Sequence, residues 1–111
     1  MNGLKQTDAY RRWEASLKDK RIKTVVTTRL LRLAGGLTGD VQPVGEGVSE
    51  LRIHYGPGYR IYYQQHKDHI ILLLCGGVKR SQSRDILLAK FLAKNWIDEE
   101  EEENESNRYR L

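Results

Sequence analysis

The sequence predicts one α+β domain, in which an N-terminal helical hairpin packs on a small, mainly antiparallel β-sheet and a C-terminal helix follows. Three observations support this prediction. Residues 10–33 show helical periodicity, residues 48–75 hold three strand-like runs, and residues 86–96 return to a helical pattern. The length of 111 residues suits a single domain with one modest core.

The first two helices follow from apolar spacing and from their end signals. Thr7 is expected to cap the first helix, because a threonine hydroxyl satisfies free N–H groups at a helix start. Apolar residues then recur at helical spacing over residues 10–17 and again over 22–33. A polar stretch at 19–21 separates the two segments, and Gly35-Gly36 ends the second.

The predicted sheet is a three-stranded meander. Residues 37–47 hold three glycines and a proline and predict a loop. Residues 48–55 and 58–64 alternate apolar and polar side chains, and Gly56-Pro57-Gly58 between them predicts a hairpin turn. The apolar run 69–75 predicts a strand covered on both faces, and the polar loop 76–83 is expected to end it.

The last helix has more apolar surface than one stripe requires. Ser81 or Ser83 is expected to cap it, and Leu87, Leu88 and Phe91 widen its apolar face. This helix is therefore either buried on more than one side or offers a patch to a partner. Residues 98–111 hold seven acidic and two basic residues and predict a disordered tail, so the domain is expected to span residues 1–97.

Charge is distributed unevenly along the chain. The net charge is +4, but residues 1–97 alone hold 17 basic and eight acidic residues, a net charge of +9. A basic domain with an acidic tail favours binding to nucleic acid, to the ribosome or to an acidic protein, although solubility alone is the plainer explanation. The chain has no apolar run of ~20 residues, no signal-peptide core and a single cysteine, which together predict a cytoplasmic protein without a membrane partner.

The hairpin GVSELRIHYGPGYRIYY, residues 47–63, is the candidate site. The expected register is Tyr55 with Tyr59, His54 with Arg60, and Arg52 with Tyr62. Like charges that lie close together on a sheet repel each other. The face is therefore either neutralised by a structural salt bridge to Glu50 or used to bind a phosphate group.

Two further cations follow the third predicted strand, Lys79 and Arg80, and a meander would bring Lys79 near the hairpin turn. The sequence contains no phosphate-binding loop of the Walker type, no cluster of histidine and cysteine with metal-ligand spacing, and no recognisable Ser-His-Asp arrangement. Neither a metal nor another cofactor is therefore expected.

Two runs, GDVQPVGEGVSELRIHYGPGYRIYY and ILLLCGGVKRSQSRDILLAKFLA, carry a family resemblance. The chain resembles the RelE/ParE superfamily of bacterial toxins over about residues 7–95, and most of all the HigB-like branch called addiction module killer proteins. The resemblance implies a RelE/ParE-like fold with a short extra strand in residues 1–6. It also implies an antitoxin partner encoded beside the toxin, with DNA contacted only through that antitoxin.

The resemblance implies the toxin component of a type II toxin–antitoxin system. The expected activity is metal-independent, ribosome-dependent cleavage of mRNA, in which the RNA 2′-hydroxyl attacks the adjacent phosphate and translation is inhibited. Two alternatives stay open. One is a non-enzymatic DNA gyrase poison of ParE type, and the other is a decayed toxin that only binds its antitoxin.

Motif positions assign Arg52, Arg60 and Lys79 as the catalytic set that the resemblance implies, and Gln82 also stands at a motif position. The substrate-binding set adds to Gln82 the residues Tyr62 and His54 of the arginine face and Arg80 of the basic face. Val78 departs from the pattern, because the branch commonly has an acid there. No late tyrosine or histidine stands at the matching place in residues 1–97, so Tyr62, His54 and Glu50 all remain candidates for the general base.

Overall fold

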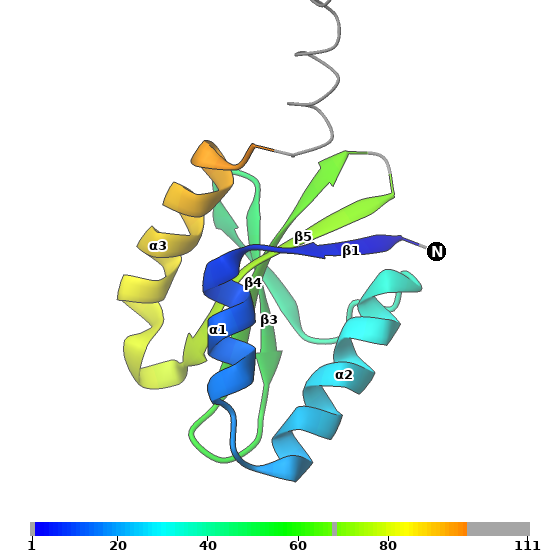
Figure 1. Cartoon of the computed structure of the whole chain (residues 1–111), viewed down its shortest axis with the longest axis vertical. Helices are drawn as coiled ribbons and strands as arrows, with labels where there is room; N and C mark the ends of the chain where they lie inside the picture. Colours follow the sequence, from blue (N-terminus) through cyan, green and yellow to red (C-terminus); the bar gives the residue numbers. More distant parts are fainter. Residues whose placement is uncertain (1, 68, 98–111) are drawn as a thin grey trace, which may run out of the picture.

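Five strands and three α-helices make up the part of the chain that the computed structural model describes, residues 2–67 and 69–97 (Figure 1). The elements are β1 (Gly3–Gln6), α1 (Asp8–Ser16), α2 (Lys20–Ala34), β2 (Val41–Gly45), β3 (Val48–Ile53), β4 (Tyr59–Lys67), β5 (Ile70–Val78), the 3-10 turn η1 (Lys79–Ser81) and α3 (Gln82–Asn95).

The sheet is larger and more varied than the sequence predicted. Its order is β1-β5-β4-β3-β2, with β1 parallel to β5 and the other neighbours antiparallel. The prediction of a helical hairpin on a small, mainly antiparallel sheet is therefore wrong. The chain is α+β with a mixed five-stranded sheet, and the core places α1 and α2 each against that sheet.

The strand β2 lies in the segment that was predicted to be a loop. Its residues pair antiparallel with β3, with a register shift between Pro43 and Gly45. A proline is tolerated here because β2 is an edge strand, where one missing N–H breaks no ladder on the open side. The sequence did not predict β2, because this segment becomes a strand by pairing with β3 and not through an apolar pattern of its own.

Thr7 joins the first strand to the first helix. The strand β1 lies parallel to β5, in the segment where the family resemblance implied a short extra strand. The Tyr10 amide then donates to Thr7 Oγ1 at 3.0 Å, which confirms the predicted cap, while Thr7 Oγ1 itself donates to the Leu74 carbonyl at 2.5 Å. The start of α1 is thereby fixed to the middle of β5.

Each face of the sheet has its own apolar cluster. Odd-numbered residues of β3, β4 and β5 pack with α1 and α2: Leu51, Ile53, Ile61, Tyr63, Ile71 and Leu73 against Tyr10, Leu17, Ile22, Val26, Leu30 and Leu33. The opposite face packs against α3, and its cluster comprises Val48, Tyr62, Leu72, Leu74, Cys75 and Ala89. The expected candidate face therefore shares its side of the sheet with a second core.

Two glycines allow both helix layers to approach β5. The strand continues through Val78, although a loop was predicted from residue 76. A Cβ atom on Gly76 would lie 2.3 Å from the Trp13 ring of α1, and one on Gly77 would lie 1.9 Å from Asp85 Oδ2 of α3. Since successive strand residues face opposite sides, each glycine makes room for one helix.

Two predictions fall partly or wholly outside the described residues, namely the tail at 98–111 and the turn at 67–68. The division of the chain at residue 97 therefore stays a prediction. Over residues 2–67 and 69–97, none of the helices has both the length and the apolar character needed to cross a membrane.

Candidate functional site

The hairpin register differs from the predicted one. Arg52 pairs directly with Arg60, Ile53 with Tyr59, and Glu50 with Tyr62. The turn takes up all of residues 54–58, and positive φ angles at Gly56 (53°) and Gly58 (78°) shape it. His54 is therefore outside the ladder, and the prediction that it lies opposite Arg60 is wrong.

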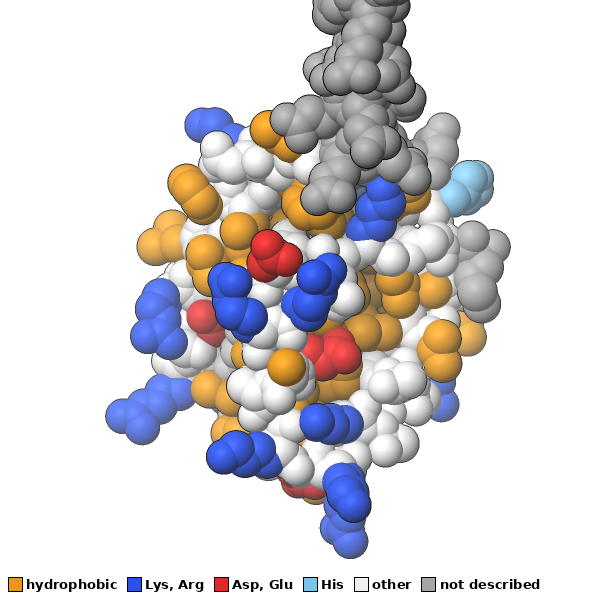
Figure 2. Space-filling view, viewed as in Figure 1, with side chains coloured by type: hydrophobic (Ala, Val, Ile, Leu, Met, Phe, Trp, Pro, Cys, Tyr) orange, Lys and Arg blue, Asp and Glu red, His pale blue; other side chains and the backbone are white. Residues whose placement is uncertain are grey.

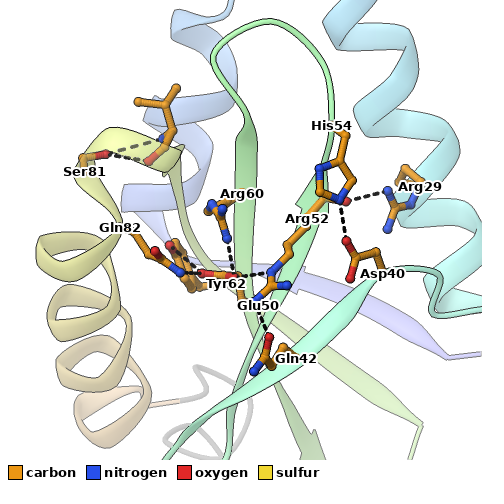
Figure 3. Close-up of polar contacts among 11 residues, drawn as sticks. Arg29, Asp40, Gln42, Glu50, Arg52, His54, Arg60, Tyr62, Ser81 and Gln82 are labelled. Atoms are coloured by element: carbon orange, nitrogen blue, oxygen red, sulfur yellow. Dashed lines mark hydrogen bonds and ion pairs between the residues drawn. The ribbon is translucent and has the colours of Figure 1, made fainter.

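The observed register sets two arginines side by side. Like charges that lie directly opposite each other destabilise a sheet. Glu50 compensates, since its Oε1 accepts from Arg52 Nε at 2.8 Å and from Arg60 Nη1 at 2.5 Å (Figure 3). Of the two explanations left open for this face, the salt bridge to Glu50 is confirmed.

The carboxylate of Glu50 is the centre of the network. Its Oε2 accepts from the Tyr62 hydroxyl at 3.2 Å and from Gln82 Nε2 at 2.8 Å, so β3, β4 and α3 all contribute donors. Burial by itself raises the pKa of Glu50. Hydrogen bonds from Arg52 and Gln82, with the charge of Arg60, outweigh burial and hold that pKa below its ordinary value. A fully buried, ionised carboxylate with four donors is a poor general base.

Tyr62 and Arg60 are less accessible than the sequence suggested. Tyr62 is fully buried, and burial followed by the charge of Glu50 raises the pKa of its hydroxyl. Its ring therefore has no open face on which a nucleic acid base could stack. Arg60 is 8% exposed, and its Nε is buried without a hydrogen-bond partner among the described residues. Its guanidinium mainly neutralises Glu50.

Arg52 remains partly reachable, with 29% of its side chain exposed. Besides Glu50, its Nη2 donates to Gln42 Oε1, which belongs to β2. The backbone of Arg52 is held as well, since its amide donates to the Asp40 carbonyl at 2.9 Å and its carbonyl accepts from Arg29 Nη1 at 2.7 Å. The guanidinium is thus fixed in direction while one side faces solvent.

Lys79 lies at the hairpin turn, as the sequence predicted, and Arg80 follows it in η1. The Lys79 amide donates to the Gly58 carbonyl at 2.7 Å, so η1 begins directly beside the turn. Both side chains are exposed, and neither forms an ion pair with another described residue. Gln82, in contrast, is engaged with Glu50. Within the expected site, Lys79 and Arg80 are therefore the exposed cations that form no ion pair with another described residue.

His54 forms an exposed pair with Asp40, a residue that the sequence did not single out. The distance from His54 Nε2 to Asp40 Oδ2 is 2.5 Å (Figure 3). The hydrogen bond with His54 lowers the pKa of Asp40, and the charge of Arg52 adds to the effect. A carboxylate that fixes one imidazole nitrogen leaves the other free for proton transfer. Asp40 could have been suspected only from its place in the quoted GDVQPVG run.

Metal and thiol chemistry find little support in these side chains. Among the described residues, no three histidine, cysteine, aspartate or glutamate side chains are grouped so that they could hold a metal ion. Cys75 is buried, and burial raises the pKa of its thiol to about 12. A thiol with that pKa is a weak nucleophile at neutral pH.

Comparison with known proteins adds one relative. No family model matches the chain. A protein of Haemophilus influenzae described as uncharacterized is 41% identical over 91 residues, which cover 82% of this chain and 92% of that protein. Its description specifies no activity, so the chemistry of the site has to be argued from the residues themselves.

Proposed function

This chain and the Haemophilus influenzae protein belong to one family, and we propose that the chain is the toxin component of a type II toxin–antitoxin system. In this proposal it acts in the cytoplasm as a metal-independent, ribosome-dependent mRNA endonuclease that inhibits translation. Its partners are an antitoxin, the ribosome and mRNA, and it meets DNA only through the antitoxin. The name of the Haemophilus influenzae protein gives no activity. The proposal is therefore supported by the resemblance to HigB-like toxins of the RelE/ParE superfamily.

One observation carries the proposal: exposed cations and an oriented imidazole share one end of the sheet. Arg52, Arg60 and Gly77 form a row across three neighbouring strands. His54 and Lys79 each follow that row by two residues, on either side of the turn. Neighbouring strands are about 4.8 Å apart, so the backbones of Arg52 and Gly77, which His54 and Lys79 follow, are separated by about 10 Å. In the proposal, an RNA phosphate with its adjoining ribose lies between His54 and Lys79.

Each group has a part in the proposed reaction. Arg52, Lys79 and Arg80 bind the phosphate oxygens and stabilise the charge that develops on them. His54, held by Asp40 through Nε2, accepts the proton of the 2′-hydroxyl at Nδ1. The 2′-oxygen bonds to phosphorus as the bond to the 5′-oxygen breaks, and the leaving 5′-oxygen takes a proton from solvent, which leaves a 2′,3′-cyclic phosphate and a 5′-hydroxyl. Glu50 and Arg60 are positioning residues in this proposal.

The burial of Arg60 and Tyr62 favours a second candidate, because it removes two expected substrate contacts from the surface. The second candidate is a non-enzymatic protein of the same superfamily, either a DNA gyrase poison of ParE type or a decayed toxin that only binds its antitoxin. Such a protein needs charge and shape for binding but no general base.

Expression in bacteria separates these functions. The 5′ ends of cellular mRNA are mapped after induction, and gyrase supercoiling is assayed with the purified chain. New 5′-hydroxyl ends within translated codons support the endonuclease. Double-strand DNA breaks with intact mRNA contradict it and favour the gyrase poison. Normal growth with a stable antitoxin complex favours the decayed toxin.

A further inference from the structure

The outward face of α3 is apolar where a surface helix is normally polar. The exposed fractions of Leu87, Leu88 and Phe91 are 71%, 42% and 62%. At about 100° per residue, Leu87 and Phe91 lie one turn apart with Leu88 beside them. These three residues form the α3 ridge, and Figure 2 shows hydrophobic side chains along the side of the molecule that α3 occupies.

The opposite face of α3 already provides the contacts that hold the helix. Ala89 is fully buried in the second core cluster, and Ile86, Leu92, Ala93 and Trp96 pack against that cluster. The α3 ridge is therefore not required to attach α3 to the sheet. Three large apolar side chains clustered on the surface of so small a domain mark a contact site for another molecule.

Charges around the α3 ridge indicate what that molecule is like. The ionised side chains exposed on α3 are basic: Arg84, with 84% of its side chain exposed, and Lys94. Lys90 is 27% exposed and lies 3.8 Å from Glu46. The one acid of the helix, Asp85, is buried and accepts from Ser81 Oγ at 2.5 Å. A complementary surface combines apolar side chains with carboxylates.

We propose that the α3 ridge is the docking surface for an amphipathic, acidic segment of a protein partner, the neutralising antitoxin. The inference rests on the proposed function, because that function supplies the partner. The apolar side of the segment covers the α3 ridge, and its carboxylates meet Arg84 and Lys94. The ridge lies on the outer side of α3, away from His54 and Asp40. An antitoxin segment docked there therefore covers the proposed reaction site only if the antitoxin makes a second, separate contact.

A second copy of this chain fits the α3 ridge poorly. Two α3 helices related by a twofold axis run either antiparallel, which sets Arg84 of one copy opposite Lys94 of the other, or parallel, which sets Arg84 opposite Arg84; both arrangements bring like charges together. Like charges in such a small contact oppose association. The chain's own residues 98–103 are also unsuitable, because all six are acidic and none is apolar.

A lipid surface is also a poorer fit than an acidic protein. Only three apolar side chains of α3 could enter a bilayer, since Ile86, Ala89, Leu92 and Ala93 belong to or pack against the second core cluster. An acidic protein segment, in contrast, can place its carboxylates at Arg84 and its apolar side chains on the ridge.

Calorimetry with the full chain and the product of the reading frame beside its gene tests this inference. The double variant Leu87→Asn/Phe91→Asn is expected to bind at least 10-fold more weakly, and Arg84→Glu several-fold more weakly at low salt. The matched control is Leu31→Asn/Leu37→Asn, which changes two leucines that are 58% and 68% exposed but lie outside α3. This control is expected to bind like wild type.

The outcomes are distinct. Weaker binding confined to the α3 variants, with unchanged circular dichroism and unchanged mRNA cleavage, supports the inference. An equal loss of binding in the control variant overturns the inference. So does a wild-type dimer that dissociates in the α3 variants. Binding of wild type to anionic phosphatidylserine vesicles that is lost in the α3 variants also overturns it. Failure of wild type to bind the neighbouring product overturns it too. Failure of the endonuclease is read separately, because mRNA cleavage is measured without the partner.

Discussion

Glu50 determines what the two hairpin arginines can do. A buried carboxylate between Arg52 and Arg60 turns a repulsive pair into a network that also ties Gln82 of α3 to the sheet. Removing one member of a buried ion pair costs more than the pair contributes, because the partner charge is left uncompensated. Because Arg60 is buried in its ion pair with Glu50, Arg52 is the hairpin arginine whose side chain solvent can reach.

Glu50→Gln is expected to lower the free energy of unfolding by about 3 kcal/mol, since two arginines lose their counter-charge in a buried setting. Urea denaturation monitored by circular dichroism measures the change. Glu46→Gln is the control, because Glu46 is 72% exposed and its distance to Lys90 is 3.8 Å; it should change stability by less than about 1 kcal/mol. Equal effects of the two substitutions would contradict a special role for Glu50.

The same carboxylate predicts a pH dependence of stability. The folded-state pKa of Glu50 lies below its ordinary value of 4.5. Its stabilising contribution is therefore complete above that value and is lost as the pH falls through the lower, folded-state pKa. Melting temperatures between pH 3 and pH 7 should fall at acidic pH for wild type and less steeply for Glu50→Gln. A parallel fall in both proteins would assign the acid sensitivity to other groups.

His54→Gln is expected to slow ribosome-dependent mRNA cleavage by about 100-fold, the usual contribution of a general base. Asp40→Asn should slow it less, because Asp40 orients the imidazole and takes no proton in the proposal. Cleavage rates on programmed ribosomes measure both effects. His69→Gln, on the exposed turn before β5, is the control. Unchanged cleavage by His54→Gln would remove His54 from the mechanism.

At the scale of elements, β5 connects the two helix layers. Gly76 admits Trp13 of α1 on one face, and Gly77 admits Asp85 of α3 on the other. The α3 start is held further by Ser81, whose hydroxyl donates to Asp85 Oδ2 at 2.5 Å. A close approach at Gly77 therefore places η1 and Lys79 beside the hairpin turn.

Gly77→Ala is expected to destabilise the fold by about 1–3 kcal/mol, because the added methyl group would overlap the Asp85 carboxylate. Gly35→Ala is the matched control, since its nearest neighbours, two backbone carbonyl oxygens, would lie at ordinary contact distances of 3.5 and 3.6 Å. Thermal unfolding compares the variants. A Gly77→Ala variant as stable as wild type would show that α3 can shift without cost.

At the scale of the whole molecule, positive charge extends well beyond the site. Residues 1–97 have a net charge of +9, and Figure 2 shows lysine and arginine side chains gathered toward the end of the molecule where the β3–β4 turn lies. Such a surface attracts a polyanion over long distances and gives binding that weakens with salt. The two exposed cations of η1 lie at this end.

Lys79→Ala and Arg80→Ala should each reduce the salt dependence of RNA binding. Each phosphate contact contributes about 0.7 to the slope of log K against log salt concentration for a single strand. Fluorescence anisotropy with a labelled oligoribonucleotide measures the slope between 50 and 200 mM salt. Arg32→Ala changes an exposed base of α2 and is the control. An equal reduction by Arg32→Ala would indicate that RNA binds the whole basic surface without preference for the turn.

Much of the fold was predictable because side-chain spacing is a local property. Thr7 as a cap, the helices around it, and the apolar odd-numbered side of the hairpin all follow from residue types a few positions apart. Loops were predicted at β2 and at Gly76-Gly77, because glycine and proline usually indicate a loop. In the structure both segments are strand, since β2 pairs with β3 and the two glycines make room for side chains of α1 and α3. The role of Asp40 was missed because its partner His54 is 14 residues away.

The sequence by itself determined the chain's charge asymmetry, its helical segments, the two long hairpin strands and the presence of Glu50, Arg52 and Arg60 on one side of the sheet. Only the tertiary structure decided the register, the five-strand order and the burial of Tyr62 and Arg60. The physical reason is that register depends on the turn, and burial depends on which helix covers a face. Both are set by contacts between residues far apart in the chain, which local periodicity does not encode.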